Sequence, residues 1–333
     1  MSKKTKYTSI GGSALIEGVM MRGNDRMAIA LRRNDGSIQL KVEALENKAK
    51  WYGKVPILRG IVTFILSMMT SYKSLMYSAD VSMEGLEEPE NPSKVDKFLD
   101  KLLGKAGMAI IGVVAMVLGV ALALLLFMYL PSLVTNWLMK DWHPALKAVI
   151  EGLMKILIFL GYISLTSLMS DMRRVYQYHG GEHKSIFCFE AKRELNPENA
   201  MACKRFHPRC GTSFILLTLI LSIVISMFIP WGSHMIVRAL LKLCFIPAIM
   251  GLAYEFIRYA GKHDNIVTKI FSAPGLWFQR ITTREPDEKQ IAVALVALKG
   301  VLNDYPLDKE IIVDEEGNYL KDKEEKEEHE SEA

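Results

Sequence analysis

The chain has 333 residues, half of them hydrophobic, and its 41 Lys and Arg against 37 Asp and Glu give a net charge of +4. This length allows two domains of ordinary size. The small positive charge lies mostly beside apolar segments, so it predicts no nucleic-acid partner, and the long apolar runs argue against a wholly soluble protein.

Residues 1–50 predict a small β-rich cap. They begin with basic and polar residues and not with an apolar signal core, so we expect no secretory signal peptide. Alternating residues on both sides of Asn34-Asp35-Gly36 indicate a hairpin. The glycine-rich stretch before it contains Glu17 and Arg22, which can form a charged pair, and it lacks the lysine of a nucleotide-binding loop.

Residues 51–93 predict an amphipathic helix followed by a linker. Between positions 56 and 79 apolar residues recur at helical spacing, and polar residues mostly occupy the other side. Such a helix can lie along the inner membrane face or dock on other helices, and a fifth membrane span is the alternative. The acidic stretch from Glu84 to Ser93 contains prolines and indicates the linker.

Residues 94–260 predict a membrane domain of four helical spans, at 106–130, 145–170, 212–230 and 234–259. The first and third spans carry no charge, and a bilayer core of about 30 Å needs about 20 apolar residues in a helix. The other two carry charges near their ends, where Glu151 and Lys155 can pair along one helix. The predicted fold is therefore mainly α.

Lysine and arginine in the connections predict the orientation. The loop 171–211 holds eight of them, and others precede the first span and follow the last. Because such residues collect on the cytoplasmic side, we expect both termini and this loop to be cytoplasmic. Three of the four cysteines would lie in the loop and one in a span, so no disulfide framework is expected.

Residues 261–307 predict a cytoplasmic helical region, and 308–333 an acidic tail. Pro286, Asp287 and Glu288 suit the first turn of a helix. Apolar residues at 291, 295, 298 and 302 would give this helix one apolar face. The charge of the tail predicts a solvated, disordered end.

The stretch "YHGGEHKSI" is the first candidate site. His179 and His183 lie four residues apart with Glu182 between them, the pattern of inverted zinc metallopeptidases. In that chemistry the histidines hold zinc and the glutamate takes a proton from water, so Glu182 is the candidate catalytic residue. Gly180 and Gly181 disfavour a helix, so the alternative is a loop with ordinary histidines, or a close approach of another backbone.

A second cluster, His207 to Cys210, lies just before the third span. Both clusters must lie at one membrane face, because the second and third spans bracket the loop that carries them. A site of His179, His183 and His207, with Cys210 or Glu190 as fourth ligand, would suit tetrahedral zinc. The alternative is that Cys210 is a small buried hydrophobe and that His207 caps the span.

Two further charged residues are candidates. Arg209 beside the second cluster suits a membrane anchor, or alternatively a contact to a lipid headgroup or phosphate. Glu255 near the inner end of the last span is a functional candidate because ionisable groups in spans are costly. Its alternative is an ion pair with Arg258 or with the interface.

Four stretches, GGSALIEGVMMRG, YQYHGGEHKSI, HPRCGTSF and APGLWFQRITTREPDEKQI, resemble the YqhQ-type family of bacterial membrane proteins. The resemblance covers nearly all of the chain up to about Leu302. It implies a multi-pass protein of the bacterial inner membrane. The family carries the description "predicted metal-dependent enzyme", which points to the same histidines, His179, His183 and His207, but it supplies no settled reaction.

Two functions follow as hypotheses. The first is an inner-membrane protein with a divalent metal, zinc by its donor set, at the cytoplasmic face, acting as a hydrolase. The alternative is a non-catalytic scaffold for membrane-protein biogenesis or quality control, which docks a membrane-protein partner or a second copy of itself. Transport is disfavoured, because the two most apolar spans have no polar residue at mid-bilayer. In each case the lipid bilayer is a partner.

Overall fold

The structure is a computed structural model that describes residues 8–45, 51–84, 113–230, 235–260, 263 and 265–322. It divides into two compact units, one from residues 1–84, 163–218 and 246–333 and the other from residues 85–162 and 219–245. The start of the first predicted span, the linker after Glu84 and the end of the acidic tail lie outside the described residues.

The first unit contains a six-stranded antiparallel sheet in which each strand pairs with the next along the chain. Its strands are β1 (Gly11–Leu15), β2 (Gly18–Arg22), β3 (Arg26–Arg32), β4 (Ile38–Ala44), β5 (Glu310–Val313) and β6 (Tyr319–Asp322). The predicted hairpin is confirmed, because β3 and β4 pair and the Asp35 carboxylate between them accepts the Ser37 N–H at 2.9 Å.

Strands β5 and β6 come from residues predicted to be an acidic tail. The apolar residues of β5, Ile311, Ile312 and Val313, are buried, and Ile311 pairs with Leu40 of β4. The acidic composition of the whole segment concealed this short β-branched run. The N-terminal β region is thus confirmed, and the far end of the chain extends its sheet.

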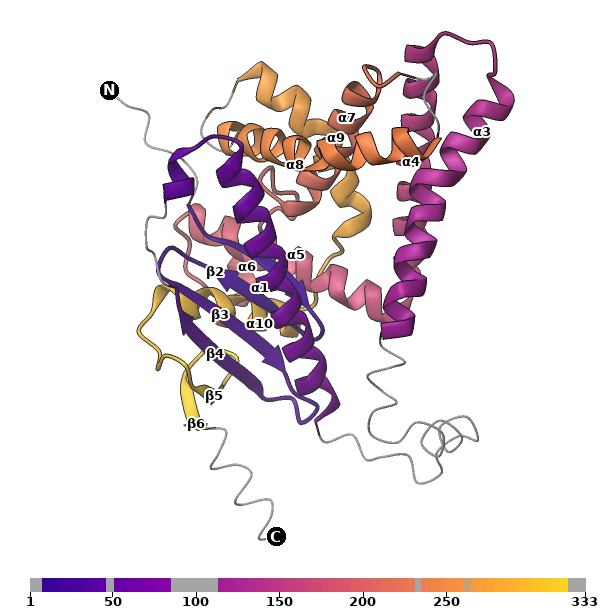
Figure 1. Ribbon diagram of the computed structural model, residues 1–333. Helices are drawn as coiled ribbons and strands as arrows, with labels where there is room; N and C mark the ends of the chain where they lie inside the picture. Colours follow the sequence, from indigo (N-terminus) through magenta and orange to yellow (C-terminus); the bar gives the residue numbers. More distant parts are fainter. Residues whose placement is uncertain are drawn as a thin grey trace, which may run out of the picture. The chain divides into compact units, whose positions relative to one another are not determined.

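Helices cover both faces of this sheet (Figure 1). Helices α5 (Ser170–Glu190) and α10 (Glu288–Leu302) pack on one face, and α1 (Leu58–Met83) packs on the other. Helix α10 is capped by Asp287, whose side chain accepts from the N–H of Gln290, and it is buried from Gln290 to Leu298. The prediction of a helix with one apolar face is therefore wrong for α10, because the sheet, α5 and α6 (Pro197–Met201) surround it.

Helix α1 turns its polar side towards the sheet. Ser74 and Ser78 are buried, and the Ser78 hydroxyl accepts the N–H of Ile16 at 3.3 Å. Most large apolar side chains of α1 point the other way and are exposed, among them Met68, Met69 and Tyr72, whereas Val81 near its end packs against the sheet. Helix α1 is amphipathic as predicted, and it is not among the described helices that are long and apolar enough to cross a membrane.

Among the described residues, three helices are long and apolar enough to cross a membrane, which indicates a membrane protein. They are Val113–Leu138, which includes the π-helical turn η2 (Leu125–Tyr129) and α3 (Leu130–Leu138), then α4 (Pro144–Thr166), and Val237–Ala260 within α8 (Met235–Ala260). Helix α7 (Gly211–Ser226) has 16 residues and spans only about 24 Å. The predicted count of four spans is therefore not confirmed. The remaining elements are η1 (Trp51–Lys54) and α9 (Ile266–Thr282).

The second unit holds a buried charge cluster centred on Glu151 of α4. Its carboxylate pairs with Lys155 at 2.7 Å, as the sequence predicts, and also with Arg238 at 3.2 Å and with Lys242, both on α8. The Glu151 side chain is 2% exposed. One carboxylate therefore holds three cations on two apolar helices, and its removal would leave them repelling one another.

We expect Glu151→Gln to destabilise the protein by about 3 kcal/mol, because it leaves buried cations without a counter-charge. The measurement is the midpoint of thermal unfolding of the purified protein in detergent. Glu43→Gln is the control, since Glu43 pairs with Lys41 at 3.2 Å in a half-exposed position and should matter little. Equal midpoints for the two variants would contradict this account of Glu151.

Candidate functional site

Helix α5 runs without a break through Gly180 and Gly181. A Cβ atom at position 180 would overlap the carbonyl oxygen of Arg284, and the Arg284 N–H donates to the Tyr176 carbonyl at 2.8 Å. The glycines therefore admit the backbone of the segment before α10 against the side of α5. Because the helix continues, His179, Glu182 and His183 lie on one helical face.

Three ligand atoms converge at this face. One atom each from His179, His183 and Cys210 lies within 4.8 Å of the other two. The Cys210 sulfur is 3.1 Å from Nε2 of His179, and Cys210 immediately precedes α7. Ligands around a tetrahedral zinc ion lie about 3.3–3.7 Å from one another, so these residues fit a metal with small side-chain adjustments.

The outer nitrogens of both histidines are held by backbone carbonyls. Nδ1 of His179 donates to Thr282 at 2.8 Å, and Nδ1 of His183 donates to Arg205. Each ring therefore keeps a proton on Nδ1 and turns Nε2 towards Cys210. Metal-binding histidines are commonly fixed in this way, because the outer hydrogen bond sets the tautomer and the ring orientation.

The charges at the cluster favour a thiolate. Burial disfavours ionisation of Cys210, but His179 and His183 beside it lower the pKa of this thiol well below its usual range. Burial likewise disfavours a charged His179, but the Cys210 sulfur raises the pKa of this ring to about 9. The start of α7 adds partial positive charge next to the sulfur. Cys210 and His179 therefore form a thiolate–imidazolium pair, and a metal bound there would displace the Nε2 proton of His179.

Glu182 is buried beside the cluster, against the first strand of the sheet. The N–H of Gly12 donates to its carboxylate, and a Cβ atom at Gly12 would lie 3.0 Å from it. Burial raises the pKa of the Glu182 carboxyl, although His183 and His179 act in the opposite direction. Glu182 is therefore a buried carboxyl group with a raised pKa, close to the three ligand residues.

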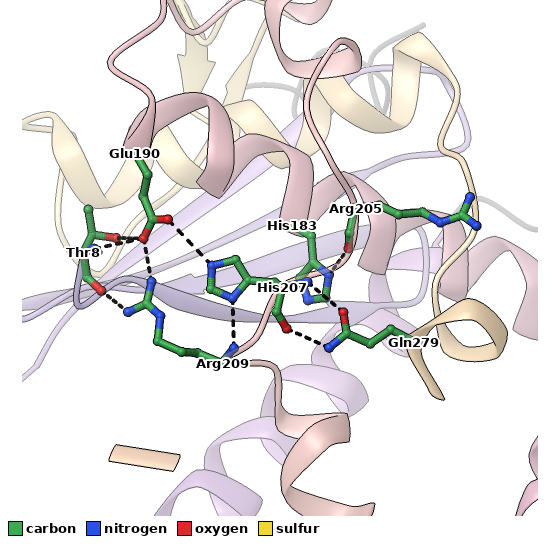
Figure 2. A network of polar contacts seen from close by, with 7 residues as sticks. All are labelled: Thr8, His183, Glu190, Arg205, His207, Arg209 and Gln279. Atoms are coloured by element: carbon green, nitrogen blue, oxygen red, sulfur yellow. Dashed lines mark hydrogen bonds and ion pairs between the residues drawn. The ribbon is translucent and has the colours of Figure 1, made fainter. Parts of the chain in front are cut away.

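His207 and Glu190 belong to a network of polar contacts, which Figure 2 shows together with the bond between His183 and Arg205. Nε2 of His207 lies 3.8 Å from the Glu190 carboxylate, and Nδ1 accepts the N–H of Arg209 at 3.3 Å. The Glu190 carboxylate also accepts from the N–H of Thr8 at 2.9 Å and pairs with Arg209 at 2.5 Å. These contacts tie the N-terminal segment to α5 and to the loop before α7.

The predicted ligand set is therefore divided by the structure. His179, His183 and Cys210 come together, whereas His207 stands next to this group, with its ring centroid 5.6 Å from that of His183. Glu190 is held by Arg209 and Thr8. Arg209, predicted as an anchor or as a phosphate contact, is instead engaged by this carboxylate.

Gln279 of α9 is a site residue that the sequence analysis missed. Its side chain is fully buried, accepts the N–H of His207 at 2.7 Å and donates to the carbonyl of the same residue at 2.7 Å (Figure 2). This pair of bonds fixes the loop that carries Cys210. Gln279 lies inside the stretch APGLWFQRITTREPDEKQI, but a glutamine followed directly by Arg280 gave no sign of a buried partner.

Two other candidates, Glu17 and Glu255, have partners that differ from the predicted ones, and a third candidate, Arg22, is exposed. Glu17 forms a two-bond pair with Arg174 of α5, at 2.5 Å for each bond, so the expected pair with Arg22 is wrong. Glu255 of α8 bonds to Arg59 of α1 at 2.6 Å and not primarily to Arg258. Arg22 is exposed at the end of β2.

Comparison with known proteins gives two matches. Residues 55–304 match the family described as "Protein of unknown function (DUF1385)". The chain is also 33% identical over 310 residues to the "Uncharacterized protein YqhQ" of Bacillus subtilis (strain 168). The aligned region covers 91% of this chain and 95% of the relative. No solved structure matches the chain. The matched region contains all three converging ligands, and the resemblance seen in the motifs is confirmed.

We expect Gly180→Ala to destabilise the protein by about 3 kcal/mol or more, because the new methyl group meets the Arg284 backbone, which cannot move away cheaply. Gly161→Ala is the matched control, since a Cβ atom there has no neighbour within 4 Å. It should be neutral or slightly stabilising. The midpoint of thermal unfolding in detergent measures both, and a Gly180→Ala protein as stable as the control would contradict the close approach.

Proposed function

We propose that this chain, which belongs to the DUF1385 family, is a metal-dependent hydrolase of the membrane. Its metal would be held by His179, His183 and Cys210. The observation that carries the proposal is the shared orientation of the two imidazoles. Both present Nε2 to the Cys210 sulfur, because both Nδ1 atoms are occupied by backbone carbonyls. A group of unrelated buried histidines has no reason to share this arrangement.

The donor set favours zinc. Two imidazole nitrogens and one thiolate suit a borderline-soft cation, and the hard cations Mg²⁺ and Ca²⁺ prefer oxygen ligands. Three protein ligands are typical of catalytic zinc sites, where the fourth position is left for water or substrate. Such a metal, when bound, would make a water molecule acidic and polarise a substrate oxygen.

The remaining chemistry belongs to Glu182. Its carboxylate would accept a proton from the attacking water and return that proton to the leaving group. The raised pKa of this buried carboxyl suits both transfers, because a group that titrates closer to neutral pH can take a proton and release it again. The N–H of Gly12 and the adjacent strand β1 hold the carboxylate in place.

The proposed location of the metal site rests on the distribution of Lys and Arg along the chain. Eight Lys and Arg residues between positions 171 and 211 favour placing this loop, and with it the metal site, at the cytoplasmic face of a bacterial inner membrane. Both termini would then also be cytoplasmic.

A scaffold that docks a membrane-protein partner is the second candidate. The exposed apolar side of α1, which includes Met68, Met69 and Tyr72, favours it, because such stripes often mark interaction surfaces. In a scaffold the cluster around Cys210 would only join the loop to the sheet, so the two candidates differ in metal content.

We expect the protein, purified without a histidine tag or chelator, to contain close to one zinc per chain by plasma mass spectrometry. A His179→Ala/His183→Ala double variant and Cys210→Ser should each lose it. His207→Ala is the matched control and should retain it, since His207 stands outside the converging group. No metal in the folded wild type would refute the proposal and favour the scaffold. Loss of metal in His207→Ala alone would return His207 to the ligand set.

We expect Glu182→Gln to keep its metal and to lose activity by about 10²–10⁴-fold, the usual contribution of a positioned acid–base group. The readout is a panel of chromogenic carboxylic and phosphoric esters. Glu198→Gln, at an exposed position on α6, should match the wild type. If Glu182→Gln instead retains full activity, or loses its metal, the role of proton acceptor is wrong. Activity that survives a chelator would assign the chemistry to the Cys210 thiolate.

A further inference from the structure

A groove lies between α1 and the first two strands of the sheet. Its volume is about 280 Å³, and its lining includes Gly11 and Gly12 of β1, Arg22 at the end of β2, and Ser67, Thr70 and Ser71 of α1. All these residues belong to one compact unit. The polar side of α1 thus forms one wall, and the glycine-rich strand forms the other.

The chemistry of this lining suits an anion. Arg22 is exposed and has no ion partner among the described residues, and none of the groove's described lining residues is acidic. The planar guanidinium can donate two parallel hydrogen bonds to a phosphate, and neighbouring hydroxyls can add more. A net positive, hydroxyl-lined groove of this size is large enough for one phosphate ester group.

The groove lies where α1 leaves the apolar helices. At its start α1 packs on them, through Phe64 against Phe214 with ring centroids 5.2 Å apart and through Arg59 with Glu255. Ser67 to Ser71 follow about 12–18 Å along the helix from Arg59. Over the same turns the outer side of α1 exposes Leu66, Met68, Met69 and Tyr72, which suits contact with lipid chains. Where this stripe contacts lipid chains, the polar groove behind it lies close to the lipid headgroups.

Gly12 borders the groove on one side of strand β1 and the candidate catalytic residue on the other. It lines the groove, and its N–H donates to the Glu182 carboxylate. The groove lies on the α1 face of the sheet and Glu182 lies on the α5 face, so strand β1 separates them. Glycine at position 12 leaves room for Glu182, because a Cβ atom there would lie 3.0 Å from its carboxylate group.

We propose that this groove binds the phosphate group of an anionic lipid, which by the exposed apolar stripe beside it is the headgroup of a phospholipid. Arg22 provides the counter-charge, and Ser67 and Ser71 donate hydrogen bonds. This binding needs no metal and goes beyond the proposed hydrolase function.

The test is native mass spectrometry of the full chain released from phosphatidylcholine nanodiscs that contain increasing phosphatidic acid. We expect the wild type to retain phosphatidic acid at least tenfold better than phosphatidylcholine. Arg22→Gln should lower this retention about tenfold, and Ser67→Ala/Ser71→Ala should lower it as well. Arg173→Gln removes an equal charge from an exposed position on α5 and should behave as the wild type.

Two further measurements distinguish a failure of the metal site from a failure of the phosphate site. The His179→Ala/His183→Ala variant should lose metal and still bind phosphatidic acid, so a failure of the metal site would not affect this result. Soluble glycerol 3-phosphate should compete only weakly. Competition at concentrations equal to those of the lipid would support the phosphate site but assign it to a soluble ester. No preference for phosphatidic acid, or equal retention by Arg22→Gln and Arg173→Gln, would overturn the proposal.

Discussion

The close approach of the segment before α10 to the side of α5 is the contact on which the site depends. It is made at Gly180, where only a residue without a side chain leaves room for the Arg284 backbone. Because this contact holds α5 on α10, and α10 lies on the sheet, the helix face with His179 and His183 is fixed relative to strand β1. The glycines that weaken the helix locally therefore permit the packing that stabilises it.

Buried polar contacts bring the second half of the site to the first. Gln279 bonds to both backbone groups of His207 in the loop between α6 and α7. Glu190 joins the same loop to the N-terminal segment through Arg209 and Thr8. Each of these side chains is costly to bury alone, so the network is stable only when complete. Its completion places Cys210 opposite the two histidines.

Helix α1 links the sheet to the apolar helices and reverses the usual use of an amphipathic helix. In a soluble protein its methionines and leucines would face the core, but here Ser74 and Ser78 do so. This arrangement is stable where the outer surroundings are also apolar. It also accounts for the polar groove at Ser67 and Ser71, because the same inward face lines it.

The sequence by itself determined the apolar helices, the hairpin at Asp35, the family and the histidine pair, since each rests on local spacing or on a long motif. It could not decide whether 179–183 is helical, because the cost of two glycines is local and the gain comes from Arg284, about a hundred residues away. It also could not select Cys210 over His207 and Glu190, or find Gln279, Gly12 and the strands β5 and β6. Those choices depend on which backbone groups meet, and only the tertiary structure brings the partners of each buried polar atom together.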